Sequence, residues 1–189
     1  MSGAPAVSAG KIVLSGETLS DGVTALRPWR DADVAALVEA CQDPEISRWT
    51  MVPSPYRETD ALAYLLQRYE LIHGGRAAPF AVVEPQGRLL GSISLMHVAW
   101  KHARAEVGYW LAADARGNGY ATRAVRQICG WGFRELGLAR IVLYAAIANA
   151  RSQRVAERAG FTREALLRSY LTGRDGRHDA VAYGLMADE

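Results

Sequence analysis

The sequence predicts a single domain of the α/β (α+β) class, built around a mixed and mostly antiparallel sheet. Three observations support this prediction. The chain has 189 residues, which fits one domain. Half of the residues are hydrophobic, which is enough for a substantial core. Helix-like and strand-like segments follow the order β-α-α-β-β-β-α-β-α-β-β, without an internal repeat or a linker. We expect residues 1–16 to form a flexible tail and residues 17–189 to form the domain.

The first part of the chain predicts one strand followed by helices. Residues 23–27 read as a short strand that ends at Pro28. Asp31 is expected to cap a helix, because apolar residues recur at helical spacing after it until Asp43-Pro44. Residues 45–49 predict a short turn of helix. A longer helix is expected over about residues 59–73, where two glycines end it.

The middle of the chain predicts a meander of strands and then an amphipathic helix. Residues 80–84, 89–99 and 103–111 read as antiparallel strands separated by turn residues. A glycine-rich turn leads into a helix expected over residues 122–136. The inner face of that helix should consist of Val125, Ile128, Cys129, Gly132 and Leu136.

The last part predicts a buried strand, a helix and a closing strand pair. Residues 141–146 are strongly apolar, as expected for a central strand. Asn149 opens a helix that ends at Gly160. Residues 161–171 and 179–186 are expected to pair as the final strands.

Composition excludes several classes of protein. The net charge of +2 is too small to predict a nucleic-acid or membrane surface. No apolar run approaches the roughly 18 residues of a membrane span, and the N-terminus does not resemble a secretory signal. The two cysteines, Cys41 and Cys129, are expected to be buried free thiols in a reducing compartment, so we expect a cytoplasmic protein. The four histidines lack metal-ligand spacing, and no metal site is predicted.

The most informative segment is the turn Arg116-Gly117-Asn118-Gly119-Tyr120-Ala121. A turn that opens a helix leaves backbone N–H groups without intrahelical partners, and the helix dipole adds positive charge at the same end. Glycine lets an anion approach these groups closely. The turn therefore predicts a phosphate site.

We considered three interpretations of this turn: a nucleotide P-loop, a dinucleotide-binding turn and an ordinary tight turn. A nucleotide P-loop requires a lysine after its second glycine, but Tyr120 follows Gly119. A dinucleotide fold places its glycines in the first βα unit, whereas this turn follows an antiparallel meander. An ordinary tight turn at a helix start remains the third alternative.

The neighbouring motifs resemble the GNAT superfamily of acetyl-coenzyme A-dependent N-acetyltransferases. Arg116-x-x-Gly119-x-Ala121 matches that family's signature, and it follows a strand, as the family requires. Asn149-x-x-Ser152 resembles the family's second block. Near the ends, Leu26-Arg27-Pro28 and the segment 175–179 resemble the RimJ/RimL branch, which acetylates protein N-termini. The resemblance covers about residues 23–186 and implies helices on both faces of a twisted sheet, splayed between the fourth and fifth strands.

The resemblance also implies where acetyl-coenzyme A is held. Pantetheine would pair with backbone groups of Leu111 and Ala113 in the splay, and the side chain of Asn149 would hydrogen-bond it. Asn149 has an alternative role as a helix cap. The pyrophosphate would lie on Arg116, Gly117, Asn118, Gly119, Ala121 and Thr122. Arg116 is equally interpretable as a surface arginine at a helix start.

The chemistry implied is direct attack of an amine on the thioester. Glu106 is the candidate base, with an alternative role as a strand glutamate paired with an arginine such as Arg104. Many relatives carry a tyrosine acid seven residues after the asparagine, but this chain has Ala156 there. Ser152 is the expected substitute acid, with Tyr170 a weaker candidate. A backbone N–H near Leu111 would stabilise the oxyanion.

The acceptor is expected to bind among the N-terminal helices, the loop 43–56 and the last hairpin. Trp49 and Tyr56 are candidate lining residues, although both are equally interpretable as packing residues. The resemblance implies acetyl transfer to a primary amine, first a protein N-terminus and second a small-molecule amine such as an antibiotic or a polyamine. A non-catalytic acyl-coenzyme A sensor and a dinucleotide binder are the rivals. The sequence leaves the oligomeric state open, a homodimer included.

Overall fold

The computed structural model describes residues 12–14, 16 and 18–188. Among these residues, eight strands form one sheet in the order β1-β2-β3-β4-β5-β6-β8-β7. The strands are β1 (Leu19–Ser20), β2 (Ala25–Arg27), β3 (Ala78–Val83), β4 (Leu89–Ala99), β5 (Arg104–Leu111), β6 (Arg140–Ala146), β7 (Thr162–Gly173) and β8 (Gly176–Met186). The helices are α1 (Val34–Ala40), α2 (Pro44–Trp49), α3 (Glu58–His73), α4 (Tyr120–Glu135) and α5 (Ala150–Ala159).

The predicted fold class is confirmed. Every neighbouring strand pair is antiparallel except β5 with β6, which is parallel. The predicted element order holds except between β2 and β3, where the structure has three helices instead of two, because the short turn predicted at residues 45–49 is the helix α2. The fourth and fifth strands of the predicted order are β5 and β6, because the structure adds the two-residue strand β1 before the first predicted strand. Three short 3-10 helices, Asp31–Asp33, Trp100–His102 and Ala113–Ala115, are additional.

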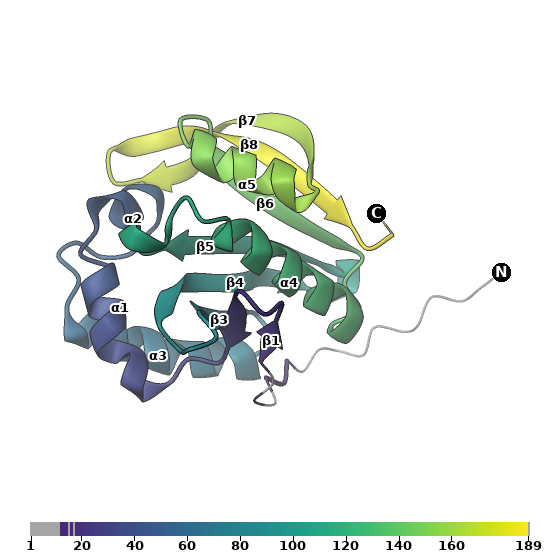
Figure 1. Ribbon diagram of the computed structural model, residues 1–189. Helices are drawn as coiled ribbons and strands as arrows, with labels where there is room; N and C mark the ends of the chain where they lie inside the picture. Colours follow the sequence, from purple (N-terminus) through teal and green to yellow (C-terminus); the bar gives the residue numbers. More distant parts are fainter. Residues whose placement is uncertain (1–11, 15, 17, 189) are drawn as a thin grey trace.

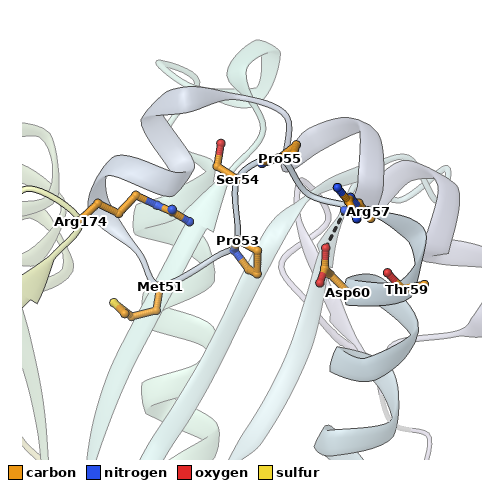
Figure 2. A pocket seen from close by; sticks show the side chains of 8 residues that line it. All are labelled: Met51, Pro53, Ser54, Pro55, Arg57, Thr59, Asp60 and Arg174. Atoms are coloured by element: carbon orange, nitrogen blue, oxygen red, sulfur yellow. Dashed lines mark hydrogen bonds between the residues drawn. The ribbon is translucent and has the colours of Figure 1, made fainter.

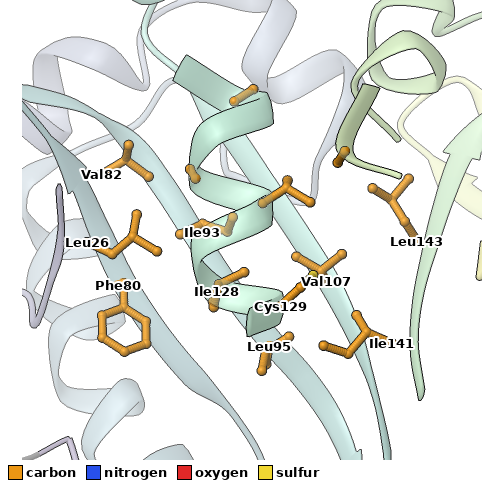
Figure 3. Packing of buried hydrophobic residues seen from close by; sticks show 14 of the residues in the cluster. Leu26, Phe80, Val82, Ile93, Leu95, Val107, Ile128, Cys129, Ile141 and Leu143 are labelled. Atoms are coloured by element: carbon orange, nitrogen blue, oxygen red, sulfur yellow. The ribbon is translucent and has the colours of Figure 1, made fainter. Parts of the chain in front are cut away.

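Helices cover both faces of the sheet, and each face has its own core (Figure 1). On one face α4 buries an apolar stripe against β4 and β5; it includes the predicted residues Val125, Ile128, Cys129, Gly132 and Leu136 (Figure 3). A Cβ atom at Gly132 would lie 2.7 Å from Leu95 Cδ1, so glycine lets α4 lie close to β4. On the other face α1 and α3 pack around Trp29, Leu37 and Leu65.

The predicted tail differs in part from what the structure describes. Residues 1–11 lie outside the described residues. Ile12 is buried in the main core and Leu14 packs against it, although both precede the boundary expected after residue 16. Apolar side chains before β1 therefore extend the packed region toward the N-terminus. The domain boundary itself stays a prediction.

Strands β5 and β6 pair only at their beginnings. Arg104, Ala105 and Glu106 lie opposite Arg140, Ile141 and Val142, and no later pair joins these two described strands. Beyond Glu106 the two strands diverge, which Figure 1 shows between the labels β5 and β6. This is the predicted splay, a gap in the hydrogen-bonded ladder of the sheet between β5 and β6.

Candidate active site

Backbone groups of β5 point into the gap. Ala112 N–H donates to Leu90 O, so the peptide that follows β5 still hydrogen-bonds toward β4. In an antiparallel ladder, alternate residues turn their N–H and C=O groups to opposite sides. Tyr109 and Leu111 therefore direct theirs away from β4, toward the gap. The C=O group of Leu111 accepts from Arg116, whereas its N–H faces the space that the splay opens.

The glycine-rich turn lies at the end of this gap. Gly117 and Gly119 both have positive φ, at 85° and 79°, a conformation that favours glycine. A Cβ atom at either position would meet no heavy atom within 4 Å, so the space above the turn is open. Gly119 is the N-cap of α4, and no described side chain caps this helix. The first N–H groups of α4, at Tyr120, Ala121 and Thr122, are left for an anion.

Arg116 points away from this open space. Its Nε and Nη2 donate to Leu111 O at 3.1 and 2.8 Å, and Nη2 lies 2.5 Å from Asp43 Oδ2. Asp43 is the N-cap of α2, where its Oδ1 accepts from Glu45 N–H. The guanidinium thus links the end of β5 to α2. Asn118 donates to Arg116 O, and the carbonyl of Ala113 accepts weakly from Arg116 N–H within the turn.

Asn149 and Ser152 lie at the start of α5, on the same face as α4. The Oδ1 atom of Asn149 accepts from Ser152 N–H at 3.1 Å, which is the capping role that the sequence left as an alternative. The Ser152 hydroxyl lies 3.0 Å from the hydroxyl of Tyr109 on β5. Ala156, one turn later, is fully buried in the core. A tyrosine hydroxyl from β5 therefore lies beside the Ser152 hydroxyl at the start of α5.

Tyr109 is a candidate that the sequence reasoning missed. Burial raises its pKa to about 12, and the hydrogen bond with Ser152 acts against this rise. The hydroxyl therefore keeps its proton near neutral pH and is a hydrogen-bond donor. Because side chains alternate along a strand, the sequence alone places Tyr109 on the face of the sheet opposite Glu106. The missing information was that α5 packs on that face.

Glu106 lies on the other face of the sheet from Tyr109. Its carboxylate contacts His97 on β4, with Oε2 3.1 Å from Nδ1, rather than the Arg104 suggested as an alternative partner. Tyr144 on β6 shares this side of the gap, and Tyr170 on β7 packs against it with ring centroids 4.7 Å apart. Burial is the main cause that raises the pKa of Tyr144 to about 12, with further contributions from Tyr170 and Glu106. Tyr170 therefore packs against Tyr144 on the Glu106 face of the sheet, not on the face that carries Ser152.

A pocket of about 430 Å³ lies where the α2–α3 loop meets the tip of the β7–β8 hairpin (Figure 2). Its walls are formed by Met51, Pro53, Ser54, Pro55, Arg57, Thr59, Asp60 and Arg174. Arg174 reaches from the hairpin and donates to Val52 O at 2.6 Å. The loop and the hairpin are the segments from which the sequence predicted the acceptor site.

The two predicted acceptor residues do not line this pocket. Tyr56 is buried in the core around Trp29 and Leu65, and burial raises its pKa strongly. Trp49 is half-buried at the end of α2; its indole N–H donates to Glu45, and the guanidinium of Arg48 lies 4.7 Å from its ring centroid. Both residues make packing contacts, which is the alternative role predicted for them.

Comparison with known proteins identifies the family. The model of the acetyltransferase (GNAT) domain matches residues 24–162. The chain therefore belongs to the GNAT acetyltransferase family, which confirms the predicted family and the expected class of enzyme, an acyltransferase. Neither a membrane-crossing helix nor a cluster of three or more metal-binding side chains occurs in the described part of the chain.

Two curated relatives differ in the acceptor that their names give. "Putative ribosomal N-acetyltransferase YdaF" of Bacillus subtilis is 39% identical over 103 residues, which are 54% of this chain and 56% of that protein. "Spermidine N(1)-acetyltransferase" of Vibrio cholerae is 28% identical over 110 residues, 58% of this chain and 62% of that protein. The alignments thus span just over half of each relative.

Two solved structures share the whole fold. A structure described as a probable acetyltransferase has a TM-score of 0.84 at 27% identity, and the match covers 92% of this chain and 98% of that one. RimJ of Mycobacterium smegmatis in complex with CoA-disulfide has a TM-score of 0.83 at 24% identity, covering 92% and 89%. The splayed sheet and the helices on both faces are therefore a known arrangement.

Proposed function

We propose that this chain transfers an acetyl group from acetyl-coenzyme A to a protein N-terminal α-amino group. The observation that carries the proposal is the division of the gap into two faces, with Glu106 on one and the Tyr109–Ser152 pair on the other. A thioester lying in the gap would meet the amine on the Glu106 face. Its thiolate would leave toward the opposite face, where hydroxyl groups can protonate it.

The turn before α4 supports acetyl-coenzyme A as the donor. Its open N–H groups and the two left-handed glycines form an anion site in which a pyrophosphate would fit. The Leu111 N–H, directed into the gap, is suited to pair with pantetheine or to stabilise the oxyanion of the tetrahedral intermediate. Coenzyme A also occupies the RimJ structure of the same fold.

Two chemical features favour a protein N-terminus as the acceptor: the single candidate base, Glu106, and the charges of the pocket beside α3. An α-amino group has a pKa near 7.7–8.0, against about 10.4 for an alkyl amine such as lysine, so one carboxylate is enough to remove its proton. The pocket beside α3 carries Arg57 and Arg174 but only one carboxylate, that of Asp60. A polyamine carries several positive charges and would be repelled by the two arginines, which favours the N-terminal acceptor over spermidine.

A direct assay distinguishes these acceptors. Purified protein, acetyl-coenzyme A and a panel of amines are monitored for release of the coenzyme A thiol. The panel contains peptides with free N-termini, the same peptides N-acetylated, spermidine and an aminoglycoside. We expect kcat/KM to be highest for free N-termini and absent for the blocked peptides. A preference for spermidine would contradict the acceptor, and tight coenzyme A binding without turnover of any amine would favour the sensor.

A further inference from the structure

The contact between Glu106 and His97 joins a shielded carboxylate to an exposed imidazole. The atoms in contact, Glu106 Oε2 and His97 Nδ1, are 3.1 Å apart. The carboxylate is mostly shielded, with 23% of the side chain exposed, whereas the imidazole is 78% exposed. One end of the pair is therefore shielded and the other faces water.

A distortion of β4 creates this contact. The register of β4 and β5 shifts between Met96 and Ala99, and His97 has a positive φ of 50° within that bulge. Met96 is opposite Glu106, so in a regular strand the next residue, His97, would point to the other face. Bulges re-aim side chains, and strained non-glycine residues at positive φ cluster at functional sites.

The reaction requires an outlet for a proton. An acceptor that enters as an ammonium carries three N–H protons and leaves as an amide with one. One of the other two is taken up by the departing thiolate, as the C–N bond forms and the C–S bond breaks. The remaining proton must reach solvent once in each cycle. A shielded base that has taken up this proton must release it before the base can act in the next cycle.

We propose that His97 is the proton relay of the base Glu106. The carboxylate of Glu106 takes a proton from the ammonium. It then passes that proton to Nδ1 of His97 and regains its charge. The imidazolium, exposed to water, loses a proton to solvent or buffer and returns to its neutral form. His97 acts through Glu106 and not on the substrate, and this inference rests on the role of Glu106 proposed above.

The other ionisable groups around the pair do not offer the same route. Arg104, exposed on β5, is permanently charged near neutral pH and cannot accept a proton. Tyr144 on β6 and Tyr170 on β7 pack against each other on this side of the gap. Both side chains are phenols, which form hydrogen bonds but are far weaker proton acceptors than imidazole. Imidazole is the side chain that gains and loses protons near neutral pH.

The test uses His97→Asn. Asparagine tolerates positive φ better than most residues, and its amide can still donate a hydrogen bond to Glu106, but it cannot relay a proton. The matched control is His102→Asn, because His102 is exposed at the turn between β4 and β5. Turnover of the best amine from the acceptor panel is measured in dilute buffer and with increasing imidazole.

We expect His97→Asn to lower kcat about 10-fold or more in dilute buffer, with KM for acetyl-coenzyme A unchanged and the control at wild-type activity. Added imidazole should restore the rate in proportion to its concentration, which a purely structural role would not produce. Turnover near the wild-type value in dilute buffer, or a loss that imidazole leaves unchanged, would overturn the relay.

Glu106→Gln separates this inference from its premise. If Glu106 is the base, this variant loses turnover in every buffer, and adding His97→Asn to it has no further effect. Wild-type turnover in Glu106→Gln would refute the base, and the relay with it. Loss of turnover in Glu106→Gln but not in His97→Asn would refute the relay alone.

Discussion

The guanidinium of Arg116 lies between Leu111 O and the carboxylate of Asp43, at 2.8 and 2.5 Å from Nη2. It therefore connects the last residue of β5, in the donor gap, with the N-cap of α2, next to the pocket loop. Both side chains of the ion pair are partly shielded, at 25% and 17% exposed. Asp43 neutralises the charge that a pyrophosphate would meet at the turn.

Asp43→Asn should strengthen coenzyme A binding, by roughly 2- to 5-fold at low salt, because Arg116 then presents an unneutralised charge beside the turn. The gain should shrink as salt rises. Calorimetric titration at two ionic strengths measures it. Weaker binding would instead mean that the ion pair with Asp43 holds Arg116 in the position from which it binds the pyrophosphate.

The control for this variant is Asp43→Ala. Asparagine can keep the hydrogen bond to Glu45 N–H, whereas alanine cannot, so only the alanine variant removes the cap of α2. We expect Asp43→Ala to lower the free energy of unfolding by about 1 kcal/mol more than Asp43→Asn. Equal stability of the two variants would remove the capping role.

Gly119→Val should abolish coenzyme A binding while the protein still folds. A side chain at this position would fill the open space above the turn and would force a residue with a branched Cβ into positive φ. A shift in melting temperature on adding coenzyme A provides the measurement; ligand at 100 times its Kd gives about 2.7 kcal/mol.

Gly137→Val is the matched control for that strain. Gly137 also has positive φ, at 63°, with no heavy atom within 4 Å of a built Cβ, but it follows the far end of α4. It should lose a similar free energy of unfolding and keep its affinity for coenzyme A. Unchanged affinity in Gly119→Val would refute the phosphate site.

If the hydroxyl groups of Ser152 and Tyr109 protonate the departing thiolate, as proposed, Ser152→Ala and Tyr109→Phe should lower kcat and leave the affinity for coenzyme A nearly unchanged. The defect should decrease when the acyl donor is a thioester of a more acidic thiol, since that thiolate leaves without a proton. Steady-state rates with the two donors give the comparison. An equal defect with both donors would exclude the acid role and leave a packing role.

Stability should fall in acid through Asp21. Burial raises the pKa of this carboxyl, but hydrogen bonds from Thr24 N–H, Arg123 and Val23 N–H outweigh it and lower the pKa to about 2. The stabilisation is thus complete above the unfolded pKa near 3.9 and is lost as pH falls toward 2. Asp21→Asn should remove on the order of 1–2 kcal/mol at pH 7 and much less at pH 2.

Chemical denaturation at both pH values measures this difference. The control is Asp188→Asn, because Asp188 is exposed near the C-terminus, and it should leave the pH dependence unchanged. An identical loss of stability at pH 7 and pH 2 in Asp21→Asn would show that the carboxyl does not act through its charge.

Local patterns were sufficient to predict the frame of the protein. The apolar spacing of α4 and the glycines of its first turn predicted both the buried face of the helix and the open N–H groups. Asn149 and Gly160 predicted the start and the end of α5, where the structure has its caps. In each case the signal lies within a few residues of the feature, so no knowledge of distant contacts was needed.

The contacts of the site could not be predicted in the same way. Arg116 meets Asp43 only because the fold brings the turn before α4 next to the N-cap of α2, and no local pattern encodes that pairing. His97 reaches Glu106 only because a bulge turns one residue to the opposite face, which alternation would have placed wrongly. Strand β1 has only two residues and is too short to give a periodic signal.

The contact between Arg174 and Val52 has a consequence for how such enzymes diverge. The candidate donor gap and phosphate turn come from one continuous stretch, from β5 to α5, whereas the pocket is closed by a loop near the N-terminus and a hairpin tip near the C-terminus. Exchanging these two segments together between relatives would change the wall of this candidate acceptor pocket without changing the candidate donor site. The chain is therefore divided into parts that selection, or a designer of chimeras, can vary separately.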